Sequence, residues 1–139
     1  MMDIYWDDFV EARIVGIEVD QDAKTATVKI DGRQCRYCTI NLQGVERLLV
    51  NEFRENNVID NVKLWKTDGL GLREALAVLI SSSNELAQQA VFGSEIERSR
   101  NQVASSTHVL LEIEPVYGAG IIAFAQGVMC VERNSQASR

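Results

Sequence analysis

The hydrophobic residues of this chain change their spacing twice, and that change limits the folds it can adopt. Between Thr25 and Ile30 apolar and polar residues alternate, which is the period of a strand with one buried face. In the middle of the chain the apolar residues recur every three or four positions, as on an amphipathic helix. From Val109 onward the alternation returns. Strands on both sides of a helical middle predict an α+β domain, with helices covering one face of an antiparallel sheet.

The N-terminal third predicts an antiparallel meander. A first strand over Val10–Val19 changes its apolar face near Gly16. Either both faces of the strand are covered there, or a β-bulge near Gly16 shifts the alternation. Asp31-Gly32 is typical of a two-residue hairpin turn, because both residue types tolerate positive φ. The return strand is then expected over Arg33–Leu42.

The rest of the chain predicts a helical middle and a C-terminal hairpin, giving about six strands and two to four helices in all. Ser82-x-x-Glu85 and Ser94-x-x-Glu97 are capping-box patterns, which predict two short surface helices between Ser81 and Thr107. We expect one domain over 1–133 and a flexible polar tail over 134–139. The other expected elements are a helix over Val45–Phe53, a strand over Val58–Trp65, a helix over Leu72–Ile80, and strands over His108–Glu114 and Ile121–Glu132.

The charge balance disfavours two classes of partner. The chain has 14 Lys and Arg against 20 Asp and Glu, and its net charge of −6 repels nucleic acid and anionic membranes. Its longest aliphatic run, Ala75–Ile80, is too short to span a bilayer. The start of the chain is acidic, unlike a secretory signal, and three cysteines do not suggest a disulfide framework. We therefore expect a cytoplasmic protein.

Cys35-Arg36-Tyr37-Cys38 has the spacing of redox and zinc motifs. It falls in an expected strand, where positions i and i+3 point to opposite faces, and not at a helix N-terminus. A zinc site would need Cys130 and His108 as further ligands. One alternative function is therefore a small metal- or thiol-dependent enzyme that uses Cys35, Cys38, His108 and Cys130. The other interpretation is that these are ordinary strand cysteines, either buried or half-buried.

Catalytic signatures are otherwise sparse. His108 is the only histidine, and we expect it on the outward face of a strand. Glu112 and Glu114 share one face of the same strand, so they could converge on a cation or a proton-transfer site, or belong to a solvated sheet face. No phosphate-binding loop or nucleophile elbow is present. We expect no cofactor, and a non-enzymatic protein.

The acidic residues are concentrated near the start of the chain. Residues 1–30 contain seven acidic and three basic side chains, a net charge of −4. Such a region can attract a basic protein partner, and the candidate contact residues are Asp7, Asp8 and Glu11. The alternative is a solvated face that keeps the protein soluble.

Three segments carry a resemblance to a known group of proteins. These are Trp6-Asp7-Asp8 leading into Ala12–Ile17, Ile40–Val45, and Tyr117–Ile121 before the last strand. In them the chain resembles small β-rich bacterial proteins, some of which are immunity proteins of toxin systems. The resemblance implies a non-enzymatic protein-binding domain, an inhibitor that blocks a toxin through an acidic surface, and it implies no catalytic residues.

A further alternative is a self-associating accessory domain. In that case the apolar segment Ile121–Val131 would form the edge at which two copies meet as a homodimer.

Overall fold

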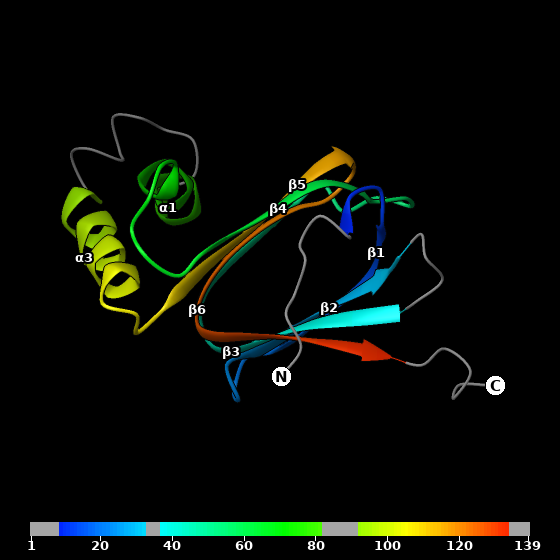
Figure 1. Cartoon of the computed structure of the whole chain (residues 1–139), viewed down its shortest axis with the longest axis horizontal. Coiled ribbons are helices and arrows are strands. Elements are labelled where there is room, and N and C mark those ends of the chain that lie inside the picture. Colours follow the sequence, from blue (N-terminus) through cyan, green and yellow to red (C-terminus); the bar gives the residue numbers. More distant parts are fainter. Residues whose placement is uncertain (1–8, 33–36, 82–91, 134–139) are drawn as a thin grey trace.

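Six antiparallel strands form a closed barrel, and two helices lie at one end of it (Figure 1). The computed structural model describes residues 9–32, 37–81 and 92–133, and these statements concern that part of the chain. The strand order is β1-β2-β3-β6-β5-β4, and β4 returns to pair with β1. The predicted α+β class and the antiparallel sheet of six strands are confirmed. Closure of the sheet was not predicted, because it depends on contacts between residues far apart in the sequence.

The elements follow one another in the order that the changes of period predict, with strands before and after a helical part. Their bounds are β1 (Arg13–Asp20), β2 (Thr25–Asp31), β3 (Tyr37–Asn51), β4 (Val58–Trp65), α1 (Leu72–Ser81), α3 (Gly93–Ala104), β5 (Val109–Tyr117) and β6 (Gly120–Arg133).

The first three strands form the predicted meander. The register of β1 against β2 shifts between Ile14 and Gly16, so the bulge is the alternative that the structure adopts. The predicted two-residue turn at Asp31-Gly32 is wrong. Asp31 pairs with Tyr37, so five residues, 32–36, connect the two strands. Asp31 stays in the ladder, where its carboxylate accepts a hydrogen bond of 2.7 Å from Arg13.

The helix predicted over Val45–Phe53 is wrong, because this segment belongs to the long strand β3. Two irregularities produce its helical spacing. Gly44 has a φ of +60°, and a bulge between Val45 and Arg47 shifts the register against β6. The bulge inserts an extra residue into β3, and the positive φ at Gly44 turns the backbone just before it. The side chains of β3 that face the barrel interior therefore recur at both strand and helix spacings, at Ile40, Leu42, Val45, Leu48 and Val50.

The helical part is confirmed at α1 and differs at α3. Ser94 does not cap α3, since the helix begins at Gly93 after Phe92 and has no side-chain cap. It is also more than a surface helix, because it buries Ile96 and Val103. The capping pattern at Ser82 lies outside the described residues. Within the described part, neither helix is long and apolar enough to cross a membrane.

The apolar side chains form two clusters, one on each face of the long strands. The barrel cluster fills the barrel interior, mainly with aliphatic residues and Phe9. The helix cluster lies between the helices and the opposite face of β5 and β6. On β6, Ile121 and Ala123 face the barrel, whereas Ile122 and Phe124 face the helices. Both faces of β6 are buried there, which explains its continuous apolar run.

Candidate functional site

His108 is buried between the helix end and the sheet, and this corrects its predicted outward position. Its side chain stacks on Phe124, with ring centroids 4.7 Å apart and an interplanar angle of 8°. Nε2 lies 2.6 Å from a carboxylate oxygen of Glu46, and Nδ1 lies 2.9 Å from the Thr107 hydroxyl. Glu46 occupies the bulge of β3, which directs its carboxylate to the helix side. No local sequence pattern indicates this contact, since its partners are 62 positions apart.

These three side chains have the components of a catalytic relay, namely a carboxylate, an imidazole and a hydroxyl. The Thr107 hydroxyl, however, also donates to the carbonyl oxygen of Gln102 at 3.0 Å, which fixes the end of α3. The backbone N–H groups of residues 105–108 all donate to carbonyl groups of residues 101–103. This turn therefore offers no backbone donor to a developing oxyanion. The array connects α3 to the bulge of β3.

An open polar pocket lies beside this array. Its volume is about 470 Å³, and among the described residues that line it Arg98 is the only arginine or lysine. Arg98 also lies 3.5 Å from Glu95, which in turn pairs with Arg47 of β3. The pocket therefore has no isolated positive charge with which to select an anion. It is lined by Arg98, Asn101, Gln102, Ser105, Thr107 and His108.

The structure brings Cys38 and Cys130 together on adjacent strands. Both are half-buried and pack against the barrel cluster, and their strands pair with each other. Burial raises the pKa of the Cys130 thiol to about 11, and the nearby Cys38 and Glu132 add to the shift. At neutral pH the Cys130 thiol is therefore protonated and a weak nucleophile. Cys35 lies outside the described residues.

The predicted set of Cys35, Cys38, His108 and Cys130 is not assembled by the described residues. His108 stacks on Phe124 in the helix cluster, whereas Cys130 belongs to the barrel side. Phe124 and Cys130 are six residues apart on β6, about 20 Å along a strand. Within the described part of the chain, no three His, Cys, Asp or Glu side chains are grouped closely enough to hold a metal ion. The described members Cys38, His108 and Cys130 therefore do not meet at one metal site.

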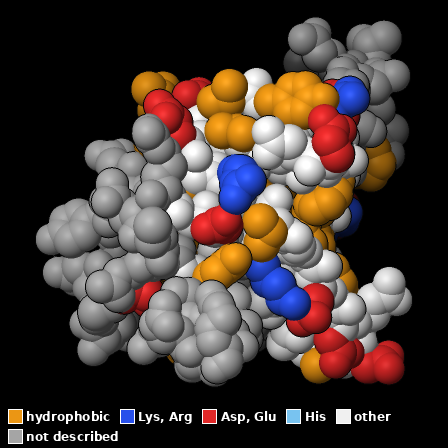
Figure 2. Space-filling view, turned by 90° about the vertical axis from the view of Figure 1, so that its right-hand side faces the viewer, with side chains coloured by type: hydrophobic (Ala, Val, Ile, Leu, Met, Phe, Trp, Pro, Cys, Tyr) orange, Lys and Arg blue, Asp and Glu red, His pale blue; other side chains and the backbone are white. Residues whose placement is uncertain are grey.

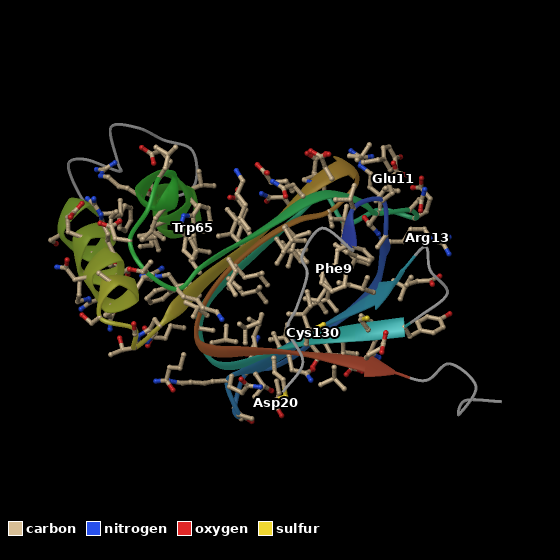
Figure 3. All side chains as sticks on the ribbon, in the orientation of Figure 1. Phe9, Glu11, Arg13, Asp20, Trp65 and Cys130 are labelled. Atoms are coloured by element: carbon tan, nitrogen blue, oxygen red, sulfur yellow. The ribbon has the colours of Figure 1, made fainter. Side chains whose placement is uncertain are left out.

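The acidic residues of the first third do not form one cluster among the residues that the structure describes. Glu18 pairs with Lys29 at 3.1 Å. Asp20 accepts hydrogen bonds from two backbone N–H groups of the β1–β2 turn. Glu11 is exposed and lies far from Asp20 (Figure 3). Asp7 and Asp8 are outside the described residues, so their contact with a basic partner stays a prediction.

Glu112 and Glu114 lie on the outer face of β5, opposite a lysine. Lys63 of β4 is in register with Glu112 and lies 3.5 Å from a carboxylate oxygen of Glu114. Asn61 also donates to Glu114. Burial raises the pKa of Glu112, and the charge of Glu114 adds to the rise, while Lys63 opposes it. Glu112 and Glu114 therefore lie beside the ammonium group of Lys63, and Glu114 also contacts the side-chain amide of Asn61.

A further surface, which the sequence interpretation missed, is formed where β1, β2, β3 and β6 lie side by side. We call it the four-strand outer face. Its register places Tyr37, Thr39 and Asn41 of β3 beside Met129 and Val131 of β6. Its other members, on β1 and β2, are Arg13, Gly16, Glu18, Thr27, Lys29 and Asp31. The alternation of apolar and polar residues could have indicated this surface, because its residues lie between the barrel-facing positions of their strands.

Three large apolar side chains of this face are exposed, namely Tyr37 at 41%, Met129 at 51% and Val131 at 39%. We call these three residues the apolar strip. Val131 is directly opposite Thr39, and Met129 is directly opposite Asn41. The charges on the neighbouring strands are paired within the face, Arg13 with Asp31 at 2.7 Å and Lys29 with Glu18 at 3.1 Å. Hydrophobic, acidic and basic side chains are intermixed on the end of the barrel that Figure 2 shows.

Comparisons with protein-family models, with curated proteins and with solved structures give no match to this chain.

Proposed function

We propose that this protein is a non-enzymatic binding domain that contacts another protein through the four-strand outer face. The observation that carries the proposal is the apolar strip, in which Tyr37, Met129 and Val131 are exposed together on two paired strands. An apolar centre with a polar, charge-paired border is the usual composition of a protein interface. The described helices pack at the other end of the long strands (Figure 1). The three side chains of the apolar strip are exposed.

A capture experiment with matched variants tests this proposal. The tagged full-length protein is incubated with lysate of its native host, and retained proteins are identified by mass spectrometry. Met129→Asp places a charge in the apolar strip, whereas Val116→Asp places one at an apolar position of β5 that is 63% exposed. We expect the wild type and Val116→Asp to retain the same partner and Met129→Asp to lose it. Equal retention by all three proteins would contradict the proposal.

Salt dependence separates this face from the acidic residues. Contacts of the apolar strip should persist at high salt, because burial of apolar surface is not screened. A basic partner held by Asp7, Asp8 and Glu11 should be released at high salt and by reversal of these charges to lysine. Release of the partner both at high salt and by the charge reversals would show that the acidic residues, and not the four-strand outer face, bind it.

An immunity-type inhibitor of a bacterial toxin is the specific form of this proposal that the sequence resemblance supports. It requires that the captured partner be toxic and that binding neutralise it. Cells that express the partner alone should stop growing, and co-expression of this protein should restore growth. Co-expression of Met129→Asp should fail to do so. A harmless partner would leave the binding function in place and reject the immunity function.

Self-association is a second candidate, and the paired charges of the outer face favour it. An acidic protein can approach its own copy most easily through a surface whose charges are internally compensated. The predicted seam over Ile121–Val131 is wrong for its first part, because Ile121–Ala125 pair with both β3 and β5 and are buried. Only Met129 and Val131 of this segment are exposed large hydrophobic residues. Sedimentation of a monomer at high micromolar concentration would reject this candidate.

A further inference from the structure

Cys38 and Cys130 form a diagonal pair across two neighbouring strands. Cys38 is opposite Glu132, and Cys130 is opposite Ile40, so the two cysteines are offset by two residues along β6. Both point to the barrel side of the sheet, where Val128 and Ile40 also lie. Diagonal neighbours on one face of an antiparallel pair can still reach each other, and the nearby Cys38 contributes to the raised pKa of Cys130. The two cysteines therefore lie at a half-buried position where β3 begins and β6 ends, and Figure 3 labels Cys130 there.

The diagonal register disfavours a disulfide. Diagonal neighbours in an antiparallel pair have Cα atoms about 7–8 Å apart. Disulfides need Cα separations of roughly 4.4–6.8 Å, so a disulfide would require the two strands to move. An ion between the two sulfur atoms replaces the S–S bond with two metal–sulfur bonds. This longer link between Cys38 and Cys130 does not require the strands to move.

The donor set limits the ion. Two thiolates are soft ligands, which select soft cations such as Cu(I) over Mg²⁺ or Ca²⁺. Structural zinc takes four ligands. The described residues provide no group of three or more His, Cys, Asp or Glu for it. Cu(I) needs only two thiolates in a linear arrangement, which two facing strands can supply.

We propose that Cys38 and Cys130 are the two ligands of a site for a soft, thiophilic monovalent cation, with Cu(I) as its representative. On binding, each thiol releases one proton and each sulfur forms one bond to the ion. The product is a bis-thiolate complex with one negative charge, and the oxidation state of copper does not change. This site lies on the barrel side of the sheet, opposite to the apolar strip, and it is independent of the proposed binding function.

Anaerobic titration of the full-length protein with Cu(I), in competition with a coloured Cu(I) chelator, tests the proposal. We expect one equivalent of Cu(I) to be taken from the chelator by the wild type and by Cys35→Ser. Cys38→Ser and Cys130→Ser should each lose this ability. X-ray absorption of the loaded wild type should show two sulfur neighbours, which tests the site even if a variant fails to fold.

Three results would overturn the proposal. Retention of Cu(I) by a Cys38→Ser/Cys130→Ser double variant would show an adventitious ion only. Loss of Cu(I) from Cys35→Ser with retention by Cys130→Ser would assign the copper to a different pair of thiols. Formation of a Cys38–Cys130 disulfide under mild oxidation, found by peptide mass mapping, together with no uptake of Cu(I), would replace the metal site with a redox pair.

Discussion

The barrel and the helix-covered end use the same strand β6 but are stabilised differently. The barrel cluster is almost wholly aliphatic, and its strands are joined by a hydrogen-bonded ladder. The helix cluster contains the large aromatic side chains Phe124, Trp65 and Phe92, and ion pairs such as Arg47–Glu95 and Arg100–Asp68 connect α3 to the rest. The barrel therefore depends on the whole sheet, whereas the helical end depends on a few side chains.

The largest expected effects come from truncating a fully buried side chain in each cluster. Ile40 faces the barrel and Leu76 belongs to α1, and both are 0% exposed. Each alanine substitution should cost about 2–5 kcal/mol of the free energy of unfolding, through lost burial and a residual cavity. We expect Ile40→Ala to raise amide hydrogen exchange in all strands, and Leu76→Ala to raise it mainly in α1 and α3. Equally widespread exchange in both variants would show that the two clusters unfold as one unit.

Closure of the barrel depends on one buried amide. The Asn57 side-chain oxygen accepts hydrogen bonds from the backbone N–H groups of Arg54 at 2.8 Å and Ala119 at 2.9 Å, and its nitrogen donates to the Arg54 carbonyl. The Asn57 backbone carbonyl accepts from Ile14 of β1. The β3–β4 loop, the β5–β6 turn and β1 therefore meet at this residue.

Asn57→Ala should lower the free energy of unfolding by about 2–3 kcal/mol, because a buried backbone N–H at Ala119 loses its partner. Urea denaturation measures the loss. Asn51→Ala is the control, since Asn51 is exposed and its substitution should change stability by no more than about 0.5 kcal/mol. A similar loss in both variants would show that Asn57 has no special part in closing the barrel.

The contact between Glu46 and His108 is the corresponding connection at the helical end. Glu46→Ala leaves Nε2 of a buried histidine without its partner, and we expect a loss of about 1–2 kcal/mol. Glu18→Ala removes an exposed ion pair with Lys29 and should cost less than about 1 kcal/mol. Thermal unfolding compares the two, and hydrogen exchange should rise in the last turn of α3 only for Glu46→Ala. Equal losses of stability in Glu46→Ala and Glu18→Ala would mean that burial of His108 does not strengthen its contact with Glu46.

The sequence was sufficient where the hydrophobic period was regular. Spacing and turn residues predicted the strand Val58–Trp65, the helix beginning at Leu72 and the last strand, and they indicated the bulge near Gly16. The prediction failed in β3, because a positive φ at Gly44 and a bulge at Glu46 imitate a helical period. Local spacing cannot distinguish an interrupted alternation from a helix.

The candidate sites were less predictable than the elements. The Cys-x-x-Cys motif indicated Cys35 and Cys38 as a pair. In the structure Cys38 lies beside Cys130 on the neighbouring strand, 92 positions later in the sequence. Glu46 and His108 meet through two strand pairings, because β6 pairs with β3 on one side and with β5, which follows His108, on the other. Side-chain sites of this kind follow from tertiary register, which a single sequence does not contain.

The smallest expected effect is a gain in stability, and it concerns Glu112 and Glu114 on β5. Burial of Glu112 and the charge of Glu114 raise the pKa of Glu112 above its unfolded value of 4.5. The folded state therefore disfavours the ionised carboxylate. The resulting destabilisation is absent below pH 4.5, where both states are protonated, and develops as the pH rises through the folded pKa.

Glu112→Gln removes this ionisation while keeping the shape of the side chain. We expect it to stabilise the protein at neutral pH by less than about 1 kcal/mol, since the half-exposed side chain is partly screened by solvent. The gain should disappear when unfolding is measured in acid, below the unfolded pKa of 4.5. Glu114→Gln is the matched control, because it weakens the contact with Lys63 and should give no gain. A loss of stability in Glu112→Gln at neutral pH would show that attraction to Lys63 outweighs burial, so that this surface is stabilised by its charges.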